Sequence, residues 1–423
     1  IEPTLAPPAF VSEPFLPYYR IRALDAEARA AERRKRLQEG FALRAWWLHE
    51  MAVTPTPLTE RMTLFWHGHF ATSQQKVRSV RLMYAQHAFL RREALGNFGR
   101  MLHGIARDPA MLVYLDNAGS RREAPNENFA REVMELFTLG EGHYAERDVK
   151  EAARAFTGWS LDRETGEYRY RRAWHDGGEK TVLGKRARLE GAAVLDLLLA
   201  QPRAAEHVTA KLWRELVSPA PDEQEVKRLA AVFRENRYEV KPLLRAMFLS
   251  NAFWDPDNRA TLIKSPVDVI VGTLRTFGIQ PLDYRPAAFA VAALGQNLFA
   301  PPNVKGWPGA EAWIDASTLL GRRRFVDRVF RGNDSMTPVA ARDEAMDKQR
   351  PRDGMRRSFE RGMSSYAFDP ERWSAGVHNG MQERGAYVTA LVLAAAPANP
   401  VPAGDDEAAL VRALVADPVY QLR

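Results

Sequence analysis

Two histidines lie one residue apart in the segment Trp66-His67-Gly68-His69-Phe70. On a helical wheel, one side consists of Leu58, Met62, Phe65 and His69, and the opposite side of Glu60, Thr63 and His67. In an unbroken helix the two imidazoles diverge by about 160° and cannot share a metal ion. They converge only if the helix ends near Gly68, a residue suited to a left-handed helix end. We therefore expect His69 to be buried and hydrogen-bonded, and His67 to be either a second core histidine or a ligand or proton carrier.

A second group of polar residues lies in residues 126–136, which are expected to form a helix with Asn126 as its N-cap. Glu127, Arg131 and Glu135 recur every four residues and form one polar row, and Glu132 belongs to the next row. Ordinary ion pairs on an exposed helix face explain this pattern. Alternatively, Arg131 holds a cluster of three carboxylates that binds a hard cation or keeps one carboxyl protonated as a general acid.

Two loops add further candidates. His175-Asp176 is followed by Gly177, Gly178 and Lys180, and the glycines allow the backbone to approach a ligand closely. The alternative for this loop is a surface turn that closes a hairpin. Residues 301–309 carry Lys305 and Trp307 on a rigid loop, for which we favour a structural role over a pocket wall.

These residues define a hypothetical polar pocket. Glu132 or Glu135 would be the general base or a ligand, His67, His175 and Asp176 would bind metal or carry protons, and Arg131 would hold the carboxylates or clamp an anion. The metal-binding set would be His67, His69, Glu127 and Glu132. Histidine and carboxylate ligands suit Zn, Mn, Fe and Mg about equally, so a divalent metal is the expected cofactor, without a defined identity.

The surrounding sequence predicts a mainly α protein. Helical periodicity covers most of the chain, so helix is expected to exceed half of the ordered residues, and the only strand-like stretch is residues 168–183. The predicted helices are 26–47, 59–69, 77–95, 126–139, 146–157, 192–200, 221–236, 240–249, 266–277, 286–294 and 407–415. The expected organisation is an N-terminal extension (1–25), a helical core domain (26–330), an irregular segment (331–380) and C-terminal helices that pack on the core (381–423).

Composition excludes several classes of protein. The chain has 423 residues, is 46% hydrophobic and contains 10 Trp and 20 Phe, which is incompatible with wholesale disorder. It has no cysteine, so disulfides, thiolate metal sites and cysteine nucleophiles are excluded. No apolar run is long enough to span a membrane. The net charge of +7 is dispersed, and clusters such as residues 322–324 are expected to be solvated helix faces, so nucleic-acid binding is not expected.

Known catalytic motifs are missing from the chain. We find no G-x-S-x-G elbow, P-loop, dinucleotide fingerprint or H-E-x-x-H motif.

Several short motifs together resemble the bacterial family called domain of unknown function 1800. The matching segments are residues 62–70 (W-H-x-H-F), 126–132 (N-E-N-F-A-R-E), 134–140, 146–149, 153–155, 157–159 (T-G-W), 175–184, 264–266 and 303–308 (N-V-K-G-W-P). The R-x-G-F-G-like motif common near the start of such proteins is not found in residues 1–18. The resemblance implies a mostly helical bacterial protein. It also implies a neighbour from the domain of unknown function 1501 family, which resembles alkaline phosphatases and sulfatases.

Two functions remain open at this point. One is a metal-assisted hydrolase that acts on an exported polymer or on a phosphate- or sulfate-bearing substrate. The other is a non-enzymatic accessory or binding protein, with a buried structural polar network, that works with the alkaline-phosphatase/sulfatase-like neighbour. A periplasmic or secreted location is favoured over a cytoplasmic one.

Overall fold

The computed structural model describes residues 2–331, 364–376, 384–402 and 406–423. Helices account for 63% of these residues, which confirms the prediction of a mainly α protein. No helix in the described ranges is long and apolar enough to cross a membrane. Much of the predicted irregular segment, residues 332–363 and 377–380, lies outside the described residues.

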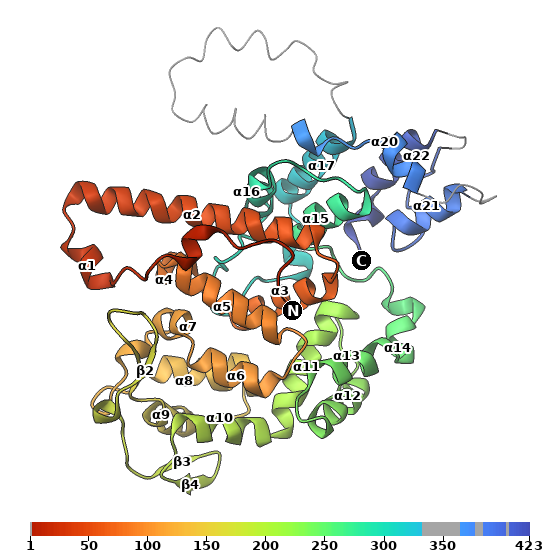
Figure 1. The fold of residues 1–423 in the computed structure, drawn as a ribbon. Coiled ribbons are helices and arrows are strands. Elements are labelled where there is room, and N and C mark those ends of the chain that lie inside the picture. The colour runs from red at the N-terminus through yellow and green to blue at the C-terminus, as the bar shows by residue number, and fades with distance from the viewer. Residues whose placement is uncertain (1, 332–363, 377–383, 403–405) are drawn as a thin grey trace. The chain divides into compact units, whose positions relative to one another are not determined.

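Contacts divide the chain into two compact units. Figure 1 shows the helices and short strands of the chain. The first unit comprises Ile1–Leu43, Thr56–Asn258 and Phe299–Trp307. The second comprises Arg44–Pro55, Arg259–Leu298 and Pro308–Arg423. Every candidate site residue named above belongs to the first unit.

The first unit is built almost wholly from helices. They are α1 (Tyr18–Ala23), the first part of α2 (Ala26–Val53), α3 (Pro57–His69), α4 (Gln74–Val77), α5 (Val80–Glu93), α6 (Phe98–Ala106), α7 (Pro109–Tyr114), α8 (Glu127–Met134), α9 (Glu146–Ala155), α10 (Gly191–Ala200), α11 (Pro202–Leu216), α12 (Glu223–Glu235), α13 (Val240–Phe248) and α14 (Asn251–Trp254). The short 3-10 turns are η1 (Ala9–Ser12), η2 (Asn117–Gly119), η4 (Arg172–Trp174) and η5 (Pro256–Asn258), and η3 (Glu135–Leu139) is a π-helical turn.

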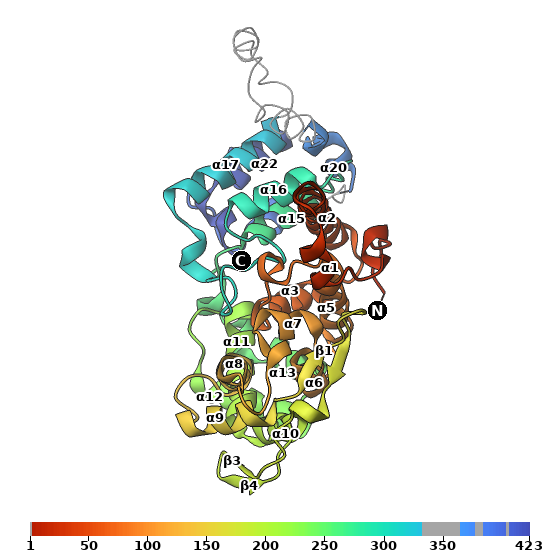
Figure 2. The same cartoon turned by 90° about the vertical axis from the view of Figure 1, so that its left-hand side faces the viewer.

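Strand structure in the first unit consists of two small antiparallel hairpins. β1 (Trp159–Leu161) pairs with β2 (Tyr168–Tyr170), and β3 (Lys180–Val182) pairs with β4 (Lys185–Ala187). The predicted insert near residues 168–183 is therefore confirmed as a β element, although it extends further on both sides. β3 packs against α9, which in turn packs against α8 (Figure 2).

Aromatic side chains form the centre of the first unit. Trp66 is fully buried, stacks on Phe98 with 5.7 Å between ring centroids, and donates from Nε1 to the carbonyl of Ala94. Phe70 and Phe137 pack edge to face at 5.1 Å beside them. These contacts join the end of α3 to η3. The packing of Trp66 and Phe70 thereby positions His67 and His69, which lie between them in the sequence.

The second unit contains the end of α2, α15 (Pro266–Thr276), α16 (Arg285–Ala293), α17 (Ala316–Arg331), α20 (Pro370–Gly376), α21 (Arg384–Val392), α22 (Glu407–Ala416) and the turns η6 (Ala310–Trp313), η8 (Ser364–Tyr366) and η9 (Pro418–Gln421). Arg322 of α17 is fully buried and donates to the carbonyl of Lys264 at 2.9 Å and to Gln421 Oε1 at 3.1 Å. The expectation that the basic cluster 322–324 is solvated is therefore wrong for its first residue. In the buried position, carbonyl and amide oxygens of the protein accept the hydrogen bonds that water would otherwise accept from this guanidinium.

Candidate functional site: a carboxylate pair at a π-helical turn

Helix α3 continues without a break through Gly68 to His69 and ends at Phe70, whose N–H donates to the carbonyl of Trp66 at 2.8 Å. The condition under which the two imidazoles could converge is therefore not met. The loop 303–307 packs closely against Gly68. A Cβ on Gly306 would lie only 2.4 Å from the Gly68 carbonyl oxygen. Gly306 also has φ of 86°. Both observations explain why glycine occupies position 306.

His67 lies in an aromatic environment. Its side chain is fully buried, and its ring centroid lies 5.1 Å from that of Phe299 and 6.0 Å from that of Trp307. Burial lowers the pKa of His67 to about 4, so the imidazole is neutral at physiological pH. The helix side that carries His67 is buried as well, and its Glu60 accepts a 2.6 Å bond from Arg91. His67 is thus positioned as a core histidine.

His69 confirms the prediction of a buried, hydrogen-bonded histidine. Its residue exposure is 2%, and Nε2 lies 3.2 Å from the carbonyl oxygen of Phe137. A carbonyl oxygen only accepts hydrogen bonds, so Nε2 carries the proton and Nδ1 carries the lone pair. Burial, Lys211 and His207 together hold the pKa of His69 well below its usual range.

The π-helical turn η3 explains why histidines gather here. Gly140 donates to the carbonyl of Glu135 at 2.9 Å, which is a five-residue spacing wider than that of an α-helix. Two carbonyl groups of this turn accept from histidines: Phe137 from His69, and Leu136 from Nε2 of His207 at 3.2 Å. The sequence pattern predicts one regular helix over residues 126–139 and gives no signal for His207.

The carboxylates of α8 differ in their environments. Glu127 is exposed in the first turn, whereas Glu132 and Glu135 are partly buried. The prediction that Arg131 holds these three acids together is not met. Arg131 instead forms a two-bond ion pair with Glu146, with Nη1 to Oε2 at 2.8 Å. Glu146 begins α9, so the guanidinium links the two packed helices.

Glu132 of α8 and Glu135 of η3 influence each other electrostatically. Burial and, to a smaller degree, the neighbouring Glu135 raise the pKa of Glu132, while Arg131 and Lys305 oppose the shift. Tyr144 donates its hydroxyl to Oε2 of Glu135. Burial and that bond raise the pKa of Tyr144 to about 12, so the phenol keeps its proton. Glu132 is therefore protonated more readily than an exposed carboxylate, and Glu135 accepts a hydrogen bond from a phenol.

The His175–Lys180 loop is fastened to α9. Asp176 accepts from Arg154 Nε at 2.7 Å, and His175 Nδ1 donates to the carbonyl of Thr157 at 3.0 Å. Lys180 is buried and donates to the carbonyls of Asp176 and Gly178. His175 and Asp176 are therefore not hydrogen-bonded to each other as a catalytic pair. The bond at Nδ1 leaves Nε2 of His175 as the acceptor nitrogen.

The predicted metal-binding set of His67, His69, Glu127 and Glu132 is not assembled. Within the described ranges, no three or more His, Asp or Glu side chains are grouped so that they could hold a metal ion. The physical reason is the unbroken α3, which sends His67 toward Phe299 and His69 toward Phe137, while Glu127 faces solvent.

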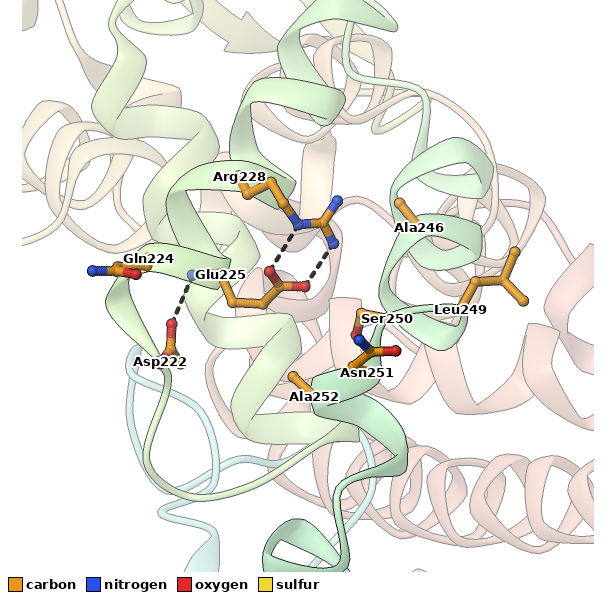
Figure 3. A pocket seen from close by; sticks show the side chains of 9 residues that line it. All are labelled: Asp222, Gln224, Glu225, Arg228, Ala246, Leu249, Ser250, Asn251 and Ala252. Carbon is orange, nitrogen blue, oxygen red and sulfur yellow. Dashed lines mark hydrogen bonds and ion pairs between the residues drawn. The ribbon is translucent and has the colours of Figure 1, made fainter.

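A separate surface hollow of about 770 Å³ lies between α12 and the α13–α14 turn (Figure 3). Its lining residues are Asp222, Gln224, Glu225, Arg228, Ala246, Leu249, Ser250, Asn251 and Ala252. Glu225 and Arg228 form two bonds with each other, at 2.7 and 2.6 Å, and Asp222 caps α12 through the N–H of Glu225. The hollow contains none of the predicted site residues.

These observations define the protein as a helical protein with a carboxylate pair at the junction of an α-helix and a π-helical turn. Residues 6–422 match the family described as "Protein of unknown function (DUF1800)", and the chain belongs to that family. No curated protein and no solved structure matches the chain.

Proposed function

We propose that Glu132 and Glu135 are the acid–base pair of a hydrolase. The observation that supports the proposal best is the raised pKa of partly buried Glu132 beside a second carboxylate that Tyr144 holds in place. Two carboxyl groups with different environments can divide the roles of acid and base. No step of this proposal requires a metal ion.

The proposed reaction involves two proton transfers, one from Glu132 and one to Glu135. The water oxygen bonds to the phosphorus or sulfur atom, and Glu132 donates its proton to the leaving-group oxygen as the bond from that atom to the leaving oxygen breaks. Glu135 accepts a proton from the attacking water through the carboxylate oxygen that Tyr144 leaves open. After departure of the products, transfer of the proton from Glu135 to Glu132, directly or through solvent, restores the starting state.

Lys305 suggests the substrate class. It is exposed and acts electrostatically on Glu132, whereas Arg131 is engaged with Glu146. A cation beside the acid favours a negatively charged substrate. The proposal is therefore a phosphate- or sulfate-bearing substrate, including a polymer that carries such groups.

The test compares Glu132→Gln with Glu127→Gln, a matched change on the exposed first turn of the same helix. Hydrolysis of phenyl phosphate, phenyl sulfate and a sulfated polysaccharide, whose leaving groups depart more easily when protonated, is measured together with thermal stability. We expect Glu132→Gln to lose activity without loss of stability and Glu127→Gln to keep both. Equal activity of the two variants would overturn the proposal.

The second candidate is an accessory protein that works with the alkaline-phosphatase/sulfatase-like neighbour. It is favoured by the number of motif side chains that have structural partners: Arg131 with Glu146, Asp176 with Arg154, and His69 with Phe137. In that case neither wild type nor Glu132→Gln hydrolyses the esters. Co-purification with the neighbour would then support this candidate.

A further inference from the structure

A second polar cluster lies beside the π-helical turn η3. It consists of His69 from α3 and His207 and Lys211 from α11, the last two one helical turn apart. The ring centroids of His69 and His207 are 6.4 Å apart. Another link between the same helices is the ion pair of Arg61 with Glu215, at 3.0 Å. The two helices therefore face each other along this side.

Both histidines present an acceptor nitrogen. Each uses Nε2–H to bind a carbonyl of η3, so each Nδ1 carries a lone pair. Nδ1 of His69 is buried and has no hydrogen-bond partner among the described residues. Nδ1 of His207 faces Gly140, where a Cβ would lie 3.0 Å from it. A glycine at this position keeps the nitrogen uncovered.

Lys211 supplies a cation to the same place. Burial and Arg214 lower the pKa of Lys211 to about 8, which still leaves the amine mostly protonated at pH 7. Across the described chain, no carboxylate forms an ion pair with it. The other charged groups that act on the cluster are Arg203 and Arg214, both on α11. A largely buried ammonium surrounded by basic groups is costly without an anion.

We propose that His69, His207 and Lys211 form a binding site for hydrogen phosphate. The ammonium donates to a phosphate oxygen, and the P–OH group donates to Nδ1 of His69. This combination requires an anion that has both acceptor oxygens and a proton to give. Sulfate at neutral pH has no such proton, and one of its oxygens would face the lone pair on Nδ1 of His69. The site is therefore selective for inorganic phosphate over sulfate.

The proton requirement also separates free phosphate from phosphate esters. The second pKa of a phosphate monoester is about 6, so at pH 8 a monoester has little acidic proton left. Inorganic hydrogen phosphate keeps one proton at that pH. Methyl phosphate should consequently bind as weakly as sulfate.

The experiment is isothermal titration calorimetry of the full chain with inorganic phosphate, sulfate and methyl phosphate at pH 8 and constant ionic strength. We expect phosphate to bind at least tenfold more tightly than the other two anions. Equal binding of the three anions, or no binding of phosphate, would overturn the site. This comparison uses the wild-type protein and does not depend on the folding of any variant.

Variants then locate the binding. Lys211→Met should weaken phosphate binding at least tenfold, whereas Lys227→Met, on the exposed face of α12, should leave it unchanged. Glu132→Gln should also leave it unchanged, so that failure of the hydrolase proposal and failure of the phosphate site are separate results. Unaltered binding in a folded Lys211→Met protein would contradict the assignment.

Discussion

His69 and His207 bind neighbouring carbonyl groups of a single π-helical turn, those of Phe137 and Leu136, from two different helices. The turn widens the helix by one residue and so leaves these carbonyls available to side chains. Pairing of the Gly140 N–H with Glu135 leaves the Leu136 carbonyl without a helical partner, and the Phe137 carbonyl lies in the last turn, where a helix offers none. Each histidine satisfies one of these acceptors. The widened turn thus links α3 and α11 to the helix that carries Glu132.

Removal of His69 should destabilise the first unit. His69→Ala deletes a ring that is almost fully buried and leaves the Phe137 carbonyl without its donor. We expect a loss of about 1–3 kcal/mol in the free energy of unfolding. Chemical denaturation measures it, with His143→Ala on an exposed loop as the control. A neutral effect of His69→Ala would mean that this contact contributes nothing.

Gly306 should tolerate no side chain. Gly306→Ala adds a Cβ 2.4 Å from the Gly68 carbonyl oxygen at a residue whose φ is 86°. Gly142 has a similar φ of 80° with no atom within 4 Å of an added Cβ, so Gly142→Ala reports the backbone cost alone, about 1 kcal/mol. We expect Gly306→Ala to lower the melting temperature clearly more than Gly142→Ala. Similar melting temperatures would show that the loop moves aside freely.

The Arg154–Asp176 ion pair should hold the β3–β4 hairpin on α9. Both side chains are partly buried, and Arg154 also donates to Glu151 at 2.9 Å. Arg154→Gln should therefore speed amide hydrogen exchange in residues 175–183. Arg186→Gln removes an exposed pair with Glu179 in the same hairpin and should change exchange little. Equal exchange in the two variants would argue against this role.

Asp108 should make stability fall as pH rises. It caps α7 and accepts from Gln86 at 2.7 Å, and burial raises its pKa from 3.8 to about 7. The folded state therefore binds this proton more tightly than the unfolded state, and stability is lost between about pH 4 and pH 7 as the proton leaves.

Asp108→Asn keeps the acceptor oxygen without the charge. We expect the variant to be more stable than wild type at pH 8, by at least about 1 kcal/mol, and the difference to disappear toward pH 4. Denaturant titration at several pH values measures it. Asp222→Asn, at the exposed cap of α12, should show no comparable dependence. The opposite pH trend would contradict the sign.

Local patterns predict much of this fold. The apolar stripe of α3 places His69 in the core, and Asn126 caps α8 through the N–H of Phe129 as its position before the helix suggests. Such features depend on residues within a few positions of each other. They can therefore be inferred from spacing alone.

The site is less predictable because its contacts join distant segments. Residues 202–216 are absent from the predicted helices, yet α11 carries His207 and Lys211. Arg131 lies on a row with Glu127 and Glu135, but its partner Glu146 comes from the next helix. The π-helical turn needs one extra residue in a helix, which ordinary periodicity does not reveal. The signal at hand is Gly140, whose φ of 81° ends the turn.

Residues 299–307 belong to the first unit, although they follow residues 259–298 of the second unit in the sequence. This short return segment brings Phe299 and Trp307 against His67. A gene fragment that stops at Asn258 would encode α3 through α14 but would leave the neutral imidazole of His67 open to water. Shortening the open reading frame from its 3′ end is therefore unsuitable for isolating this unit. A fragment that contains the complete first unit must include residues 299–307, joined to Asn258 by a designed linker.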